Sequence, residues 1–132
     1  MHKVQADIEQ LSELILSYSM ERLRMDPPSI DHPLSQTTLE ELAGQTITER
    51  GLGGEEALRL FVETLAPACI SEDHPRYLAF VPTAPSEAST LFDLVVGASN
   101  ICASSWLEGA GAIYAENQAL RWISDIAGLP AE

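Results

Sequence analysis

The chain has 132 residues, a single-domain length, and its 45% hydrophobic and 20% charged residues are typical of a folded protein rather than a disordered one. Its net charge is −13, with most of the acidic residues in residues 1–73. This acidity, without a lysine- or arginine-rich patch, argues against binding to nucleic-acid phosphates or to an anionic membrane. No stretch approaches the roughly 20 apolar residues that a membrane-spanning helix needs.

Residues 4–25 carry the clearest helical pattern. The apolar residues that recur at helical spacing are Val4, Ile8, Leu11, Ile15 and Tyr18, with Leu14 beside them. Pro27 and Pro28 end this helix, because proline cannot continue it. An apolar stripe of this length has to be covered, either by the helix's own domain or by a second subunit. The residues alone leave both interpretations open.

Two shorter helices are predicted next. The first covers residues 38–46, because Thr38 followed by Glu41 matches the capping-box pattern. A glycine-rich turn follows, and the second helix covers residues 55–66. Its apolar face consists of Leu58, Phe61, Val62 and Leu65.

The second half of the chain begins with a short aromatic and apolar run, residues 77–81. Prolines on both sides predict an extended segment, since proline disfavours the helical conformation in the residue before it. Helices are then predicted over residues 86–100, largely buried, and 112–127, where Gly128 and Pro130 mark the end. The predicted fold class is therefore mainly α, with little or no sheet.

Two motifs in this second half are similar to those of a known enzyme family. The sequence HPRYLAFVPTAP begins at His74, and SSWLEGAGAIYAENQALRWISDIAGLP follows after the next predicted helix. Together they resemble the front of the group II pyridoxal-phosphate-dependent amino-acid decarboxylases, fold-type I enzymes that include the aromatic-amino-acid and glutamate decarboxylases. The similarity extends from about Gly53 to Pro130. It implies an N-terminal helical dimerisation region, residues 1–73, and the start of the large cofactor domain, residues 74–132.

The resemblance also implies what the chain contributes. Members of this family bind pyridoxal phosphate through a lysine Schiff base, and the cofactor acts as an electron sink. The only lysine here is Lys3, outside the matching stretch. We therefore expect the N-terminal part of a decarboxylase, without bound cofactor and inactive alone. Family members are dimers whose N-terminal helices embrace the partner, so a homodimer or higher oligomer through these helices is expected, with an amino-acid substrate only in the full enzyme.

Two groups of residues match the family's substrate pocket. The first is Phe80, Val81, Pro82 and Thr83; its alternative interpretation is a buried linker in which Thr83 caps the next helix. The second is Cys102 and Ser104, which match positions that lean into the partner's active site; its alternative is a tight packing position. Because several relatives carry larger residues at this second group, the substrate class stays open. No catalytic, cofactor-binding or metal-binding residue is predicted.

The remaining conspicuous residues are interpreted as structural. His74 is expected to be structural, Glu116 to serve in packing or in a dimer contact, and Trp106 and Trp122 to lie in the core. Cys69 and Cys102 lack Cys-x-x-Cys spacing and lie among apolar or small residues, which predicts buried free thiols. Free thiols and the lack of a recognisable signal peptide favour a cytoplasmic setting.

Two other classes of protein remain open. The chain is alternatively a stand-alone helical self-association or interaction protein derived from such an enzyme. An unrelated acidic helical bundle would require the HPRYLAFVPTAP match to be accidental.

Overall fold

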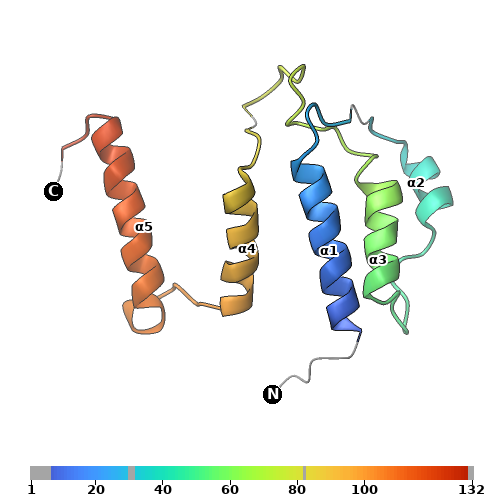
Figure 1. The fold of residues 1–132 in the computed structure, drawn as a ribbon, viewed down its shortest axis with the longest axis horizontal. Helices are drawn as coiled ribbons and strands as arrows, with labels where there is room; N and C mark the ends of the chain where they lie inside the picture. Colours follow the sequence, from blue (N-terminus) through green and yellow to red (C-terminus); the bar gives the residue numbers. More distant parts are fainter. Residues whose placement is uncertain (1–6, 30–31, 82, 131–132) are drawn as a thin grey trace. The chain divides into compact units, whose positions relative to one another are not determined.

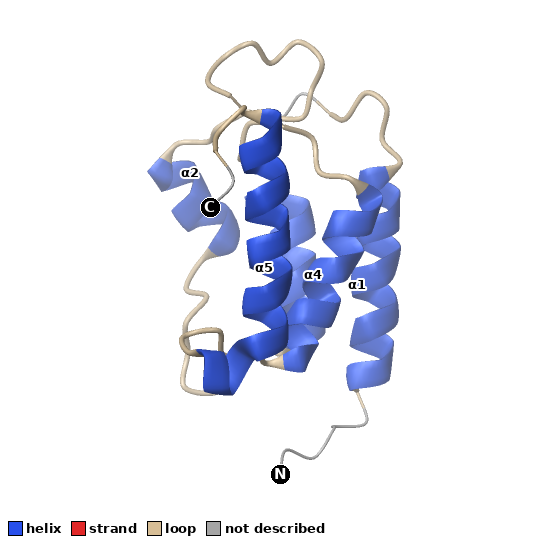
Figure 2. Cartoon of the chain, turned by 90° about the vertical axis from the view of Figure 1, so that its left-hand side faces the viewer, coloured by secondary structure: helices blue, strands red, loops and turns tan. Residues whose placement is uncertain are grey.

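The structure is a computed structural model that describes residues 7–29, 32–81 and 83–130. The elements are, in chain order, α1 (Ile8–Leu23), α2 (Gln36–Ala43), α3 (Gly54–Leu60), the π-helical turn η1 (Phe61–Leu65), α4 (Glu87–Ser99) and α5 (Trp106–Ile126). Within the described ranges there is no strand, as Figure 2 shows. The predicted mainly α class is confirmed.

Helix α2 begins earlier than the capping-box pattern predicts. Its N-cap is Ser35, whose hydroxyl oxygen accepts a hydrogen bond from the backbone N–H of Thr38 at 3.1 Å. Thr38 therefore lies in the first turn of the helix and is not its cap. The helix ends at Ala43, because Gly44 follows with a φ of 61°.

The segment over residues 77–81 is neither helix nor strand. It bends at Ala79 and Phe80, and Phe80 has a φ of 57°, in the left-handed region. The segment is therefore not continuously extended. Proline on either side excludes a helix, but it does not force every residue between the prolines into the extended region.

The chain divides into two compact units, Met1–Ser86 and Glu87–Glu132. The boundary drawn from the sequence after Asp73 lies inside the first unit. Asp73 is tied back to α1, because its carboxylate accepts a hydrogen bond from the Arg22 guanidinium at 2.7 Å. The two units are described separately below.

In the first unit, α1 lies beside α3, and α2 contacts η1 (Figure 1). The rings of Tyr18 and Phe61 meet edge to face, with centroids 6.1 Å apart. Leu11 packs against Gly54, where a larger residue would collide with its side chain. One side of the apolar stripe of α1 is therefore partly covered within its own unit. The exposed apolar side chains that remain on this helix are Ile8, Leu14 and Leu16.

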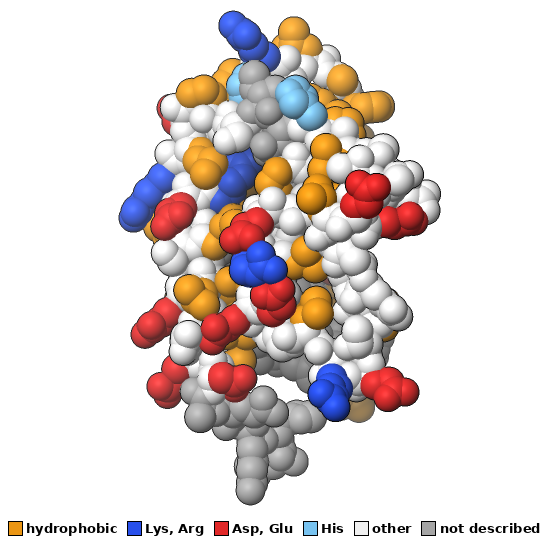
Figure 3. All heavy atoms as spheres, turned by 90° about the vertical axis from the view of Figure 1, so that its right-hand side faces the viewer, with side chains coloured by type: hydrophobic (Ala, Val, Ile, Leu, Met, Phe, Trp, Pro, Cys, Tyr) orange, Lys and Arg blue, Asp and Glu red, His pale blue; other side chains and the backbone are white. Residues whose placement is uncertain are grey.

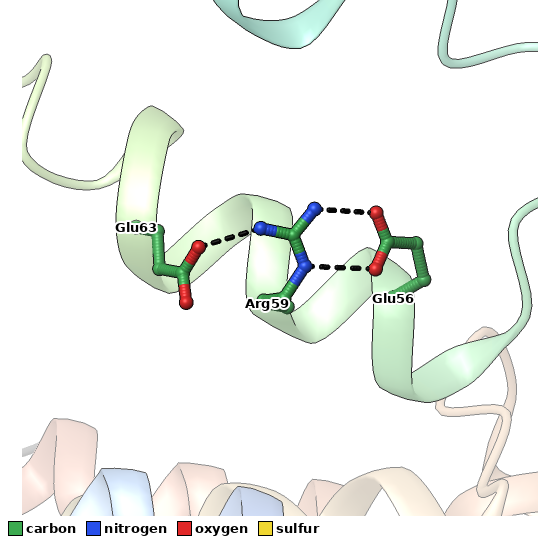
Figure 4. A network of polar contacts seen from close by, with 3 residues as sticks. All are labelled: Glu56, Arg59 and Glu63. Carbon is green, nitrogen blue, oxygen red and sulfur yellow. Dashed lines mark hydrogen bonds and ion pairs between the residues drawn. The ribbon is translucent and has the colours of Figure 1, made fainter.

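The α3–η1 helix carries a local network of charges on its exposed side. Arg59 donates two hydrogen bonds to Glu56, at 2.8 and 2.6 Å, and one to Glu63 at 2.6 Å (Figure 4). Such exposed pairs one turn apart stabilise a helix by only about 0.3–0.5 kcal/mol each. We interpret this network as a solvated helix face.

Replacing Asp73 by asparagine is expected to destabilise the first unit by about 1 kcal/mol at neutral pH. The Arg22 hydrogen bond holds the pKa of Asp73 below its ordinary value. The ionised carboxylate therefore stabilises the fold above its unfolded-state pKa of about 3.9, and this stabilisation is lost as the pH falls through the folded-state pKa. Urea unfolding should show the difference between wild type and Asp73→Asn shrinking below about pH 4. The matched control is Glu72→Gln. A stability difference between wild type and Asp73→Asn that is the same at neutral pH and below about pH 4 would contradict the prediction.

Apart from Pro28, the described residues contain no buried hydrophobic side chain. Figure 3 shows hydrophobic side chains reaching the surface between charged ones on one face. In the second unit Phe92, Trp106 and Trp122 are 66%, 62% and 66% exposed. The second unit by itself therefore buries neither α4 nor the two tryptophans, contrary to the predictions. These predictions assumed that every apolar face is covered from within the same chain.

The same correction applies to the cysteines. Cys69 and Cys102 are free thiols, as predicted, but both are exposed rather than buried. No helix in the described ranges is long and apolar enough to cross a membrane.

Candidate functional site

The turn before the first candidate group is organised by His74. Its backbone N–H donates to the carbonyl of Ser71 at 3.1 Å, and its carbonyl accepts from Tyr77 at 2.8 Å. The ring nitrogen Nδ1 accepts from the backbone N–H of Arg76 at 3.0 Å. These local bonds occupy the histidine in shaping the turn that leads to Phe80.

The first candidate group is exposed. Phe80 and Val81 are 89% and 94% exposed, Thr83 is also exposed, and Pro82 lies outside the described residues. Thr83 precedes the start of α4 at Glu87 by four positions, so it is not the cap of that helix. The alternative interpretation, a buried linker in which Thr83 caps the next helix, does not fit this geometry.

Phe80 combines exposure with an unusual backbone. A φ of 57° is rare for a bulky aromatic residue and costs on the order of 1 kcal/mol. The ring therefore extends from a strained turn, with almost no contact within the chain to compensate the strain. Such a position fits a side chain whose contacts are made with another molecule or another part of a larger protein.

The second candidate group belongs to the other unit and lies in a hydrogen-bonded cluster before α5. Cys102 Sγ and Ser104 Oγ are 3.2 Å apart. Ser104 Oγ donates to Glu108 Oε2 at 2.9 Å, and Ser105 Oγ donates to the same oxygen at 2.7 Å. The structure thus brings Cys102 and Ser104 together and adds Ser105 and Glu108, which the sequence analysis did not single out.

The hydrogen bonds of this cluster shift two pKa values. The hydrogen bonds from the side chain and backbone of Ser104 lower the pKa of the Cys102 thiol. The hydroxyl groups of Ser105 and Ser104 lower the pKa of Glu108. Both acidic groups are exposed, so their ionised forms are also accessible to solvent.

Helix α5 starts at Trp106, whereas the predicted helix starts at residue 112. Gly109 lies between these two starts, inside the observed helix. Gly109 is buried and departs from helical geometry, with φ −134° and ψ 33°. The helix predicted from the sequence begins only at residue 112, after Gly109 and Gly111. The Ser105-x-x-Glu108 spacing is a capping-box pattern and was available to place the start. Here, however, the two side chains bond to each other, and Ser105 makes no side-chain cap bond to the backbone.

The described residues do not fit a site for pyridoxal phosphate or a metal ion. A Schiff base needs a lysine, and Lys3, the sequence's single lysine, lies outside the described ranges. In the part of the chain that is described, no group of three or more histidine, cysteine, aspartate or glutamate residues is placed to hold a metal. The exposed groups offer apolar contact, hydroxyls and one thiol.

Comparison with known proteins bears on the predicted resemblance. No protein-family model matches the chain, and no solved structure matches it. An aromatic-L-amino-acid decarboxylase from Bacillus atrophaeus is 28% identical over 123 residues, which cover 92% of this chain. The chain spans about a quarter of the length of that relative. The resemblance to the amino-acid decarboxylases that the motifs predict is thus confirmed, over most of this chain and a part of the relative.

Proposed function

We propose that the chain is the N-terminal part of a pyridoxal-phosphate-dependent amino-acid decarboxylase, a carboxy-lyase, and that it supplies dimer contacts and part of the substrate pocket. The similarity over 92% of the chain carries this proposal. The exposure of apolar side chains on α4 and α5 supports it, because such surface is normally covered by other parts of a protein. A cytoplasmic location, consistent with two free thiols, belongs to the same proposal.

The cofactor in this proposal is held by other residues than those described here. When bound, pyridoxal phosphate supplies an electron sink for the loss of the α-carboxylate as carbon dioxide. The chain itself contributes no lysine from its described part. Its role is to bind and orient the substrate side chain, and the 132-residue chain alone is expected to be inactive.

The substrate contacts in this proposal come from two separate groups. In the first unit, Phe80 and Val81 give apolar contact for an amino-acid side chain, and Thr83 offers one hydroxyl beside them. In the second unit, Cys102 and Ser104 offer small polar groups to the active site of the partner subunit. Their small size leaves room for a bulky substrate side chain.

The natural gene product provides the test. An antibody against this chain should isolate a protein of several tens of kilodaltons that releases carbon dioxide from an amino acid when pyridoxal phosphate is present. In that protein, Phe80→Gly should raise KM for the amino acid by about tenfold, the effect of losing one apolar pocket contact. Glycine keeps the positive φ available, so folding should be preserved.

Leu78→Gly is the matched control, because Leu78 is equally exposed at 92% but is not part of the proposed wall. A similar rise of KM in both variants would remove Phe80 from the pocket. A natural product of several tens of kilodaltons that does not bind pyridoxal phosphate would refute the proposed function.

The alternative function is a stand-alone helical protein that associates with itself. The exposed apolar faces favour it as well, since an unaccompanied chain would cover them by association. A natural product with a mass near 14.3 kDa would support this alternative.

A further inference from the structure

The turn that leads to Phe80 is tied to α1 by an ion pair. Arg22, in the last turn of α1, donates from Nη2 to Asp73 Oδ1 at 2.7 Å, across 51 positions of the chain. The two side chains are 33% and 19% exposed, so solvent screens this pair less than the more exposed Arg59 pairs. The Arg22–Asp73 pair therefore connects two parts of the first unit that are distant in sequence.

Two successive turns surround this anchor. The His74 N–H donates to the Ser71 carbonyl at 3.1 Å, and the Tyr77 N–H donates to the His74 carbonyl at 2.8 Å. The His74 ring takes part as well, because its Nδ1 accepts from the Arg76 N–H at 3.0 Å. These bonds fix the chain direction over residues 71–77, which we call the anchored turn.

Beyond the anchored turn, the side chains have almost no packing to hold them in place. Leu78, Phe80 and Val81 are 92%, 89% and 94% exposed. Phe80 adopts its φ of 57° without such packing. Its location relative to α1 therefore depends, from the N-terminal side, on the anchored turn and on what holds that turn. Asp73 gives the turn a charged contact with α1.

We propose that Arg22 and Asp73 are positioning residues, whose ion pair ties the anchored turn to α1 and so sets where the Phe80 ring lies in the first unit. The consequence for substrate binding rests on the proposed function, in which Phe80 contacts the substrate side chain. The tethering of the turn does not depend on that function. A displaced ring loses contact with the substrate in its ground state and in its transition state alike, which weakens binding without slowing the reaction of the bound complex.

The tether is tested in the 132-residue chain by NMR relaxation of the backbone amides. In Asp73→Asn the turn loses its charged contact with α1, so the order parameters of the Arg76 and Tyr77 amides should fall from about 0.85, the rigid range, to below about 0.6. The amides of α3 should keep their values, because this helix lies outside the tether. Glu72→Gln is the matched control, since it removes the neighbouring exposed acid and should leave the turn ordered. Unchanged order parameters of Arg76 and Tyr77 in Asp73→Asn would overturn the proposal.

A second variant reaches the same contact from α1. Arg22→Gln should loosen the Arg76 and Tyr77 amides as Asp73→Asn does, and it takes the place of Asp73→Asn if circular dichroism shows that variant to be unfolded. Arg22→Lys keeps a cation opposite the carboxylate and should preserve most of the order. Combining Arg22→Gln with Asp73→Asn should add little to either substitution alone, since both remove one contact. Fully additive losses of order would contradict the proposal, because the two residues would then act through separate contacts.

In the natural decarboxylase that the proposed function requires, the readout is the split between KM and kcat. Asp73→Asn should raise KM for the amino acid several-fold, by less than the rise of about tenfold expected for Phe80→Gly, and leave kcat unchanged. A merely structural role would instead lower the active fraction, and with it the apparent kcat, at unchanged KM. With Phe80→Gly already present, Asp73→Asn should have no further effect on KM, because no ring remains to be positioned. The same rise of KM with and without the Phe80 ring would refute the positioning role.

The two measurements separate this proposal from the proposed function. The NMR readout needs no decarboxylase activity. A turn that loosens in Asp73→Asn, together with a natural product that releases no carbon dioxide, would refute the proposed function and support the tether. An active decarboxylase whose turn stays ordered in Asp73→Asn would support the proposed function and refute the tether.

Discussion

Replacing Gly109 by alanine is expected to detach the Cys102–Ser105 segment from the start of α5. The new methyl group would meet the Cys102 carbonyl oxygen and Ala103 Cα, at 2.6 and 2.8 Å. These are backbone atoms, so they cannot move aside by a change of rotamer. Overpacking of this kind typically costs about 1–3 kcal/mol. The polar contacts of Ser104 with Cys102 and Glu108 would be lost with the displacement.

Gly111 is the matched control on the same helix. A Cβ there would meet nothing within 4 Å, and this position is helical. Gly111→Ala should therefore stabilise α5 by about 0.5–1 kcal/mol, the usual difference between the two residues in a helix. Replacing glycine by alanine is thus expected to destabilise the start of α5 at position 109 and to stabilise the helix at position 111.

Hydrogen exchange measures both effects. Amide exchange in the first turn of α5 should accelerate by about fivefold or more in Gly109→Ala, because a cost of about 1–3 kcal/mol is expected and 1.4 kcal/mol corresponds to a factor of ten in an opening equilibrium. In Gly111→Ala it should slow. Slower exchange in both variants would show that the segment tolerates a methyl group at Gly109.

The helices were largely predictable because their periodicity is local. Residues 8–23 and 54–65 carry apolar side chains at helical spacing, and both form helices. Helix starts were less predictable, because each depends on one hydrogen bond. Ser35 and Thr38 are both acceptable caps in sequence, and only the structure shows that Ser35 accepts the bond.

The candidate site residues came from the resemblance rather than from chemistry, and their role stays a prediction. Phe80 was identified, but its positive φ was not, since nothing in a proline-flanked aromatic run requires it. Glu108 was missed because it precedes residue 112, where the last predicted helix begins. Burial was the least predictable property. An apolar stripe shows that a face has to be covered, but not by which part of the protein, and the second unit by itself leaves Trp106 and Trp122 exposed.

The same reasoning bears on α1 and gives the last prediction. Leu11 and Ile15 are partly covered within the first unit, whereas Leu14 and Leu16 are 41% and 43% exposed. Leu14 and Leu16 point to opposite sides of α1, because residues two positions apart do not share a helix face. In the proposed dimer the partner embraces this helix and meets both side chains. The double variant Leu14→Arg/Leu16→Arg is therefore expected to weaken self-association by at least about tenfold in Kd, since losing two apolar contacts costs more than 1.4 kcal/mol.

Arginine makes this test stringent. The chain carries a net charge of −13, so added positive charge lowers repulsion between copies, and any loss of association reports lost apolar contact. The control is Leu42→Arg/Ile47→Arg, which replaces two exposed side chains of α2 and the loop after it. Sedimentation velocity at micromolar concentration should show association for the wild type and control, and monomer for the α1 variant.

A second pair of substitutions tests whether the self-association interface lies on α1 or on α4 of the second unit. Phe92→Arg/Val96→Arg places the same charges on α4, where both side chains are more than 60% exposed. If this pair abolishes association and the α1 pair does not, the interface lies on α4 and the proposed role of the N-terminal helix is wrong. If neither wild type nor any variant associates, the exposed surface of this chain is covered by a different polypeptide segment, and dimerisation through α1 is excluded for the chain by itself.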